Sequence, residues 1–94
     1  MERVVILAIV KGEVVATVKH PAYESRRLLL VDRIDGQGAE QGGYLVVVDS
    51  VGAGVGETVL VIDEGGSAQQ VLDAPSTPIR SVIVGIVDHI AVDQ

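Results

Sequence analysis

The sequence predicts an all-β fold, a small closed five-stranded β-barrel with one short helix. Apolar runs rich in Val and Ile recur along the chain, and such branched side chains favour strands because they pack well on a pleated surface. Glycine- and proline-containing segments separate these runs, as is typical of turns between short strands. The chain has 94 residues and a mass of 9.8 kDa, so a single domain over residues 1–94 is expected.

Six apolar runs predict the five strands, because the first two runs join into one long bent strand. The runs are residues 4–10, 14–18, 28–31, 44–48, 58–62 and 82–87. Gly12 lies between the first two runs and predicts a bulge or a sharp bend. His20-Pro21 ends this strand, since proline lacks the N–H that a strand ladder needs. Gly85 predicts a bulge or a close backbone contact in the last strand.

Two segments between the runs carry other signals. The first, residues 35–43, holds Asp-Gly-Gln-Gly and Gln-Gly-Gly and is expected to be a loop. In the second, Ser67-Ala68-Gln69-Gln70 matches a capping box, with Ser67 as the N-cap and Gln70 reaching back. A short helix over about residues 68–73 is therefore expected, ending before Pro75.

The composition predicts self-association. Hydrophobic residues make up 48% of the chain, with no Phe, no Trp and two Tyr. A domain this small buries only about 60–65% of the surface that its unfolded chain exposes, so its aliphatic surface exceeds what one core can cover. Large exposed apolar patches generally mark association sites. A homo-oligomer with closed symmetry is expected.

The charge and the residue types argue against several other classes of protein. A net charge of −6 opposes nucleic-acid binding, which depends on Lys and Arg. The absence of cysteine excludes disulfides and thiolate chemistry. The apolar run at residues 4–10 is far shorter than the roughly 20 residues that a membrane-spanning helix needs. Neither a nucleic acid nor a membrane is expected as a partner.

Few residues could support catalysis or hold a metal ion. The candidates are Ser50, His20 and His89, and nothing in their spacing indicates a triad, which is recognised by geometry. Ser50 is expected to be a turn residue that bonds local backbone, and His20 to lie at a surface turn. No spacing resembles a zinc or calcium site. No catalytic residue, metal or cofactor is expected.

The most informative segment is the glycine loop, residues 50–56, between two apolar runs. Gly52, Gly54 and Gly56 are spaced by two, so they do not form the dinucleotide fingerprint. A strand rather than a helix is expected to follow, which disfavours phosphate binding. Three glycines this close let another chain approach the backbone, so the loop suits a place where copies of the chain crowd together. An ordinary hairpin turn is the alternative.

A five-stranded barrel of this size also suggests an oligonucleotide-binding (OB) fold. Such modules stack bases on aromatic side chains in a basic groove, and two tyrosines with a negative net charge do not supply that surface. An OB-like module that binds single-stranded nucleic acid or a protein remains the alternative function.

Five motifs in order resemble the EutN/CcmL family of bacterial microcompartment pentamer proteins, from about Leu7 to Ile90. They are GEVVATVK at residues 12–19, LLLVDRID at 28–35, DSVGAGVGE at 49–57 followed by VLV at 59–61, GGSA at 65–68 and IVGIVD at 83–88. The DSVGAGVGE motif is the most specific of the five.

The resemblance implies a structural role. Members form cyclic pentamers of small OB-like barrels with a narrow axial opening, which close the vertices of carboxysome or metabolosome shells in the bacterial cytoplasm. The implied partners are copies of the chain itself and the hexameric and pseudohexameric shell proteins. In such a pentamer, Gly52, Ala53 and Gly54 would lie where the loops of neighbouring subunits converge.

Overall fold

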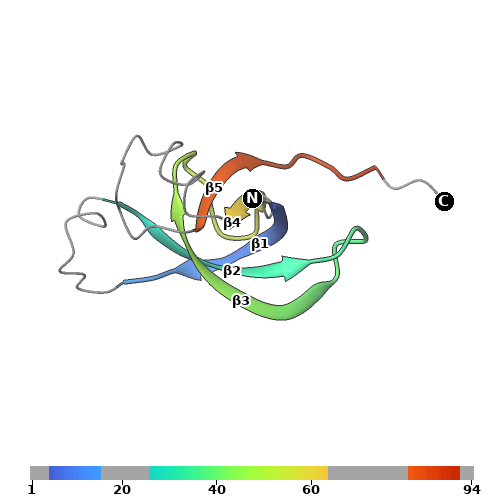
Figure 1. Ribbon diagram of the computed structural model, residues 1–94, viewed down its shortest axis with the longest axis horizontal. Coiled ribbons are helices and arrows are strands. Elements are labelled where there is room, and N and C mark those ends of the chain that lie inside the picture. The colour runs from blue at the N-terminus through green and yellow to red at the C-terminus, as the bar shows by residue number, and fades with distance from the viewer. Residues whose placement is uncertain (1–4, 16–25, 64–80, 92–94) are drawn as a thin grey trace.

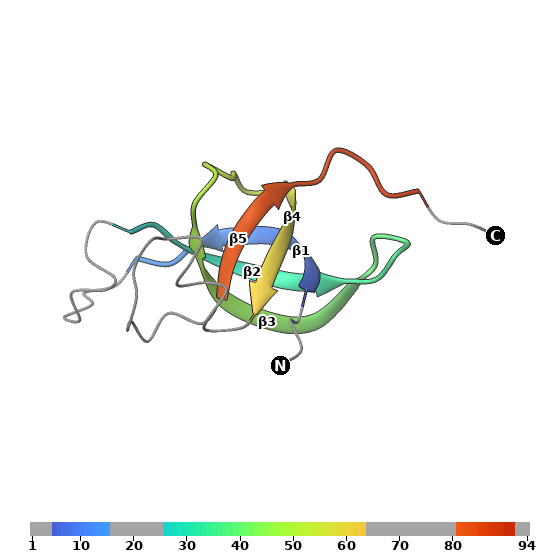
Figure 2. The ribbon, with the colours of Figure 1, turned by 45° about the horizontal axis from the view of Figure 1, so that its top comes forward.

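The structure, a computed structural model, describes residues 5–15, 26–63 and 81–91. Every regular element in these ranges is a β-strand: β1 (Val5–Glu13), β2 (Leu28–Ile34), β3 (Glu40–Asp49), β4 (Thr58–Asp63) and β5 (Ser81–Ile86). They form a closed barrel in the order β1-β2-β3-β5-β4 (Figures 1 and 2). The predicted five-stranded barrel is confirmed. The helix expected over residues 68–73, residues 16–18 of the second apolar run, and His20 lie outside the described residues.

All neighbouring strands in the barrel are antiparallel except β3 and β5. The parallel β3–β5 seam has only two pairs in register, Val48 with Val82 and Asp49 with Ile83. The longest pairing joins β2 to β3, from Leu28 opposite Val48 to Ile34 opposite Glu40. The seam between β3 and β5 is therefore the shortest join in the barrel.

Both glycines that predicted irregular strands lie at or beside a register shift. In β1 the register shifts between Val10 and Gly12, as the sequence predicts. In the β4–β5 pair, Leu60 lies opposite Gly85 while Val61 lies opposite Ile83, so Val84 is the extra residue. These bulges sharpen the bend of the strands and help a five-stranded sheet to close.

The core is built almost entirely from small aliphatic side chains on the inner faces of the strands. Its buried members are Ile6, Ala8, Val10, Leu29, Val31, Val47, Ala53, Val59, Val61 and Ile83. In β1 and β4 the buried and less buried positions alternate along the strand, which is the period of a sheet with one face in a core.

The third strand begins earlier than the sequence predicts. Residues 40–43, expected to be loop, form the first part of β3, which runs from Glu40 to Asp49. A positive φ of 72° at Gly42 accommodates the irregular register there. The actual turn is shorter, and the Asp35 carboxylate holds it by accepting hydrogen bonds from the amides of Gln37 at 2.8 Å and Ala39 at 3.0 Å.

Beyond β5, residues 87–91 form a C-terminal arm that leaves the barrel on the side of the β2–β3 turn (Figures 1 and 2). The amide of Val87 still donates to the carbonyl oxygen of Thr58 at 2.8 Å. Within the part of the chain that the structure describes, no helix is long and apolar enough to cross a membrane.

Candidate subunit interface

The first half of the glycine loop, residues 50–56, is held by the carboxylate of Asp49. Oδ1 of Asp49 accepts hydrogen bonds from three consecutive amides, those of Val51 and Gly52 at 3.0 Å and of Ala53 at 3.3 Å. Asp and Asn side chains commonly cap backbone turns in this way. The loop is therefore an ordered turn, even though it contains three glycines.

The second half of the loop is also fixed. The carboxylate of Glu57 accepts a hydrogen bond from the amide of Gly54, and the amide of Glu57 donates to the carbonyl oxygen of Gly54 at 3.1 Å. The amide of Gly56 donates to the carbonyl oxygen of Val10 at 2.8 Å, which ties the loop to β1. Glu57 occupies the position where a phosphate-binding fingerprint would need glycine, and it uses its charge inside the loop.

The three residues predicted to lie at the subunit axis differ in their surroundings. Gly52 is exposed, with a positive φ of 77° and open space where a Cβ would lie. Gly54 is half-buried, and a Cβ there would lie 3.3 Å from Glu57 Oε1. Ala53 is fully buried and belongs to the core of its own barrel. The small size of Ala53 thus has an explanation within the chain, and Gly52 and Gly54 are left as the residues that others could approach.

Apart from Ser50, the exposed side chains of the loop are apolar. Val51 is 38% exposed and Val55 is 66% exposed, and no charged side chain lies within residues 50–56. An uncharged, preordered tip with two exposed valines suits contact with another apolar surface better than contact with water.

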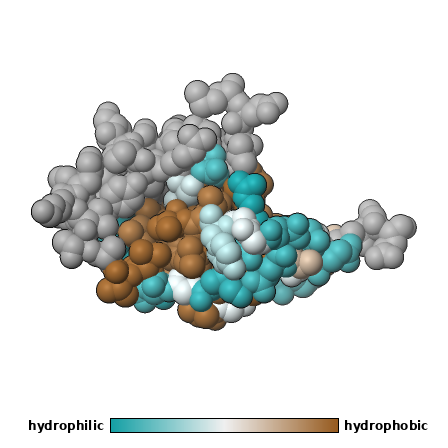
Figure 3. All heavy atoms as spheres, turned by 90° about the horizontal axis from the view of Figure 1, so that it is seen from below, coloured by the Kyte–Doolittle hydropathy of each residue, from teal (hydrophilic) through white to brown (hydrophobic). Residues whose placement is uncertain are grey.

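A second apolar area covers the outer face of β2 and β3. Tyr44 and Val46 are both more than half exposed, and Leu28 and Leu30 lie half-buried on the neighbouring strand. Leu30 lies directly opposite Val46, so their side chains share a face. Seen from below the view of Figure 1, the described residues show one area where apolar side chains gather and another that is mostly polar (Figure 3).

Charged side chains border this area. Lys11 Nζ lies 2.7 Å from Glu40 Oε1. The hydrogen bond and the charge of Glu40 raise the pKa of Lys11, and the same hydrogen bond holds the pKa of Glu40 below its usual range. Beside them Asp32 is only 1% exposed, and its Oδ1 has no hydrogen-bond partner among the described residues.

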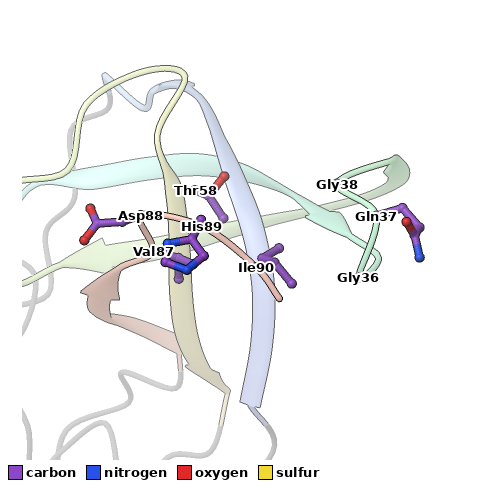
Figure 4. Close-up of a pocket in the computed structure, with 8 residues that line it drawn as sticks. All are labelled: Gly36, Gln37, Gly38, Thr58, Val87, Asp88, His89 and Ile90. Atoms are coloured by element: carbon purple, nitrogen blue, oxygen red, sulfur yellow. The ribbon is translucent and has the colours of Figure 1, made fainter. Parts of the chain in front are cut away.

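A hollow of about 450 Å³ separates the C-terminal arm from the β2–β3 turn. Its lining includes Gln37 of the turn, Thr58 of β4, and Asp88 and His89 of the arm. Figure 4 shows the side chains of Gln37 and Asp88 pointing away from each other. Because the polar groups do not converge, this hollow lacks the organised donors and acceptors of a small-molecule site.

The structure does not assemble a triad from the described candidates. His89 is exposed and lines the hollow, whereas Ser50 is not among the lining residues that the structure describes. The prediction that Ser50 bonds local backbone is wrong, because its hydroxyl donates to the carbonyl oxygen of Ile83 on β5 at 2.5 Å. Asp49 makes the local bonds instead. The described residues contain no group of three or more carboxylate or imidazole side chains that could hold a metal ion.

Sequence reasoning missed the residues that shape the loop. The sequence predicts no role for Arg27, and Asp49 and Glu57 stand out in it only as the ends of the DSVGAGVGE motif. An Asp immediately before a glycine-rich turn is a usable capping signal. No sequence signal joins Arg27 to Asp49, because 22 residues separate them and only the β2–β3 pairing brings them together.

Comparison with known proteins identifies relatives along nearly the whole chain. A family model described as "Ethanolamine utilisation protein EutN/carboxysome" matches residues 5–88. The bacterial microcompartment shell vertex protein EutN of Salmonella typhimurium is 41% identical over 90 residues, covering 96% of this chain and 90% of that protein. The shell vertex protein PduN of the same organism is 45% identical over 89 residues, covering 90% of this chain and 97% of that protein.

A solved structure has the same fold. The GrpN pentameric microcompartment shell protein from Rhodospirillum rubrum superposes with a TM-score of 0.82 at 39% sequence identity. The match covers 94% of this chain and 99% of that one.

Proposed function

The chain belongs to the EutN/CcmL family, and from this premise we propose that it is a vertex protein of a bacterial microcompartment shell and acts as a cyclic homopentamer. The names of its relatives support this function over that of an OB-like binding module. The same names support a location within such a shell. The role is structural, and no residue is assigned a catalytic part in it.

Two separate apolar areas on the barrel support a ring. A cyclic assembly uses heterologous contacts, in which each subunit presents different surfaces to its two neighbours. One area is the tip of the glycine loop with Val51 and Val55, and the other is the outer face of β2–β3 with Tyr44 and Val46. Subunits packed side by side in a ring would cover both.

The glycine loop would lie near the ring axis. Gly52 and Gly54 leave its backbone uncovered by side chains, and the hydrogen bonds that the Asp49 and Glu57 carboxylates accept from its amides fix its shape. Five copies of a narrow, uncharged tip can meet at an axis with little steric or electrostatic repulsion. This position is supported by the exposure of Val55 and by the smallness of the residues beside it.

A pentamer at a vertex would introduce curvature into the shell. A flat net of hexameric shell proteins cannot close, and replacing one six-fold position by a five-fold one removes a sector and forces curvature. The proposed partners are therefore hexameric and pseudohexameric shell proteins, which meet the outer rim of the ring.

Coexpression with hexameric shell proteins tests this function directly. With the intact chain, closed polyhedral particles are expected by electron microscopy. Without the chain, the same hexamers should give open-ended tubes or sheets. A Leu29→Asp variant, which places a charge in the core, serves as a non-folding control. Closed particles of equal number with and without the chain would contradict the proposal.

A further inference from the structure

Arg27 makes an unusual set of contacts at the base of the glycine loop. Its Nη1 donates to Oδ2 of Asp49 at 3.2 Å and to the carbonyl oxygen of Ala53 at 2.6 Å. Its Nε lies 3.5 Å from Oε1 of Glu13 at the end of β1. One side chain therefore reaches the beginning of the loop, its middle and a neighbouring strand.

The two oxygens of the Asp49 carboxylate have separate partners. Oδ1 accepts the three loop amides, while Oδ2 accepts the Arg27 guanidinium. The Asp49 side chain is only 4% exposed, and a buried carboxylate needs a compensating charge. Arg27 supplies that charge and at the same time sets the direction in which Oδ1 points.

Arg27 also holds the loop from its far side. The amide of Ala53 donates to Asp49, and the carbonyl oxygen of Ala53 accepts from Arg27. The backbone amide and the backbone carbonyl of Ala53 are therefore both hydrogen-bonded to members of the Arg27–Asp49 ion pair. Loss of the guanidinium would leave the Ala53 carbonyl without this donor and the Asp49 carboxylate without its cation.

A loop with three glycines loses more conformational freedom on ordering than an ordinary loop. Ordering it before assembly lowers the free-energy cost of bringing several copies together. In the single chain this ordering depends on Asp49 and Glu57, and Asp49 in turn depends on Arg27.

We propose that Arg27 is a positioning residue for assembly: it fixes the glycine loop in the shape in which neighbouring subunits can meet. This inference rests on the proposed pentamer. It does not require Arg27 itself to contact another subunit. Its role comes from the bonds it makes to Asp49, Ala53 and Glu13 at the base of the loop.

The test compares three variants of the full chain. Arg27→Met keeps a flexible, unbranched apolar side chain and removes the donors and the charge, whereas Arg27→Lys keeps the positive charge on a single ammonium donor. Arg33→Gln is the matched control, because Arg33 is an exposed arginine of β2, the strand that follows Arg27, and has no ion pair among the described residues.

Two measurements separate assembly from local order. Native mass spectrometry of mixed unlabelled and nitrogen-15-labelled rings gives the rate of subunit exchange. Hydrogen exchange gives the protection of the Val51, Gly52 and Ala53 amides. For Arg27→Met we expect subunit exchange to be about tenfold faster or more, as for loss of a charge-assisted hydrogen bond, with loss of protection at the three amides. Arg27→Lys should restore both only in part, because lysine keeps the charge but lacks the forked donor geometry of arginine, and Arg33→Gln should match the wild type.

Equal exchange rates and equal amide protection in Arg27→Met and the wild type would overturn the inference, as would a failure of lysine to restore either. If Arg27→Met does not fold, the double variant Arg27→Met/Asp49→Asn removes the unpaired charge while keeping an amide-capping oxygen. It should still exchange subunits faster than Asp49→Asn alone. A wild-type chain that is not pentameric would refute the proposed function, and amide protection would then still decide whether Arg27 orders the loop.

Discussion

The hydroxyl of Ser50 donates a hydrogen bond to the carbonyl oxygen of Ile83, 2.5 Å away, across the parallel seam between β3 and β5. That seam has two residue pairs in register, so this side-chain bond is a substantial addition to it. A residue whose chemistry first suggests a nucleophile therefore has a structural role, closing the barrel where its strand pairing is shortest.

Replacing this serine should weaken the barrel. Ser50→Ala is expected to lower the free energy of unfolding by about 1 kcal/mol, because a partly buried carbonyl loses its donor. Ser50→Thr keeps the hydroxyl and serves as the control. Urea denaturation followed by circular dichroism measures both. Equal stability of the alanine variant and the wild type would show that the bond is dispensable.

Substitution of Gly52 is expected to destabilise the protein because of the backbone conformation at this position. Its φ is 77°, and no atom of the described residues beyond its chain neighbours would lie within 4 Å of a Cβ at this position. Gly52→Ala should therefore cost about 1 kcal/mol through conformational strain alone. Gly12→Ala is the matched control, since it has the same open space without a positive φ. Chemical denaturation checks the pair, and equal costs at both positions would contradict this account.

A substitution at Gly54 tests the assembly of the ring rather than the folding of the barrel. Among the described residues, a Cβ at this position would meet only Oε1 of Glu57, at 3.3 Å, so Gly54→Trp should leave the barrel folded. If loops of neighbouring subunits converge there, the indole should prevent ring closure. Far-ultraviolet circular dichroism monitors folding, and sedimentation monitors assembly. Unchanged assembly would place this loop away from the axis.

The β2–β3 turn should loosen in acid. Hydrogen bonds from the amides of Ala39 and Gln37 hold the pKa of Asp35 below its usual range. Because the folded state lowers this pKa, the stabilisation is present above the unfolded value of about 4 and is lost as the pH falls through the folded value. The Gln37 and Ala39 amide resonances should therefore shift only below about pH 4. In Asp35→Asn, which cannot titrate, these shifts should be absent.

The core should respond strongly to truncation. Leu29 is fully buried, and Leu29→Ala should lower the free energy of unfolding by about 2–5 kcal/mol. Val15 is 94% exposed, and Val15→Ala should leave the free energy of unfolding nearly unchanged. Thermal and chemical denaturation measure both variants. A small loss at Leu29 would contradict its place in the core.

The strands were predictable where branched aliphatic residues decide the local structure. The run at residues 58–62 is β4 almost to the residue, and Gly12 lies at the register shift in β1. Side chains such as Val59 and Val61 both prefer strands and fill the core, so local and global preferences agree.

The beginning of β3 was not predictable in the same way. Glu40, Gln41, Gly42 and Gly43 have the composition of a turn. They extend the strand because Ile34 pairs with Glu40 and because Lys11 forms an ion pair with the same residue. These are tertiary contacts, which override the local preference.

The glycine loop, too, was predictable from the sequence only in part. Its glycines and its exposure could be inferred from composition, but its geometry depends on Arg27 and on Glu57. Burial of Ala53 also follows from how the loop folds back onto the core. Only the folded barrel shows that Ala53 is buried while Gly52 and Gly54 keep some exposure.

The mass of the native particle tests the central claim most directly. A cyclic homopentamer predicts about 49 kDa, five times the 9.8 kDa of one chain, by native mass spectrometry at micromolar concentration. A stable monomer, or a ring with another number of subunits, would contradict the assignment to a shell vertex.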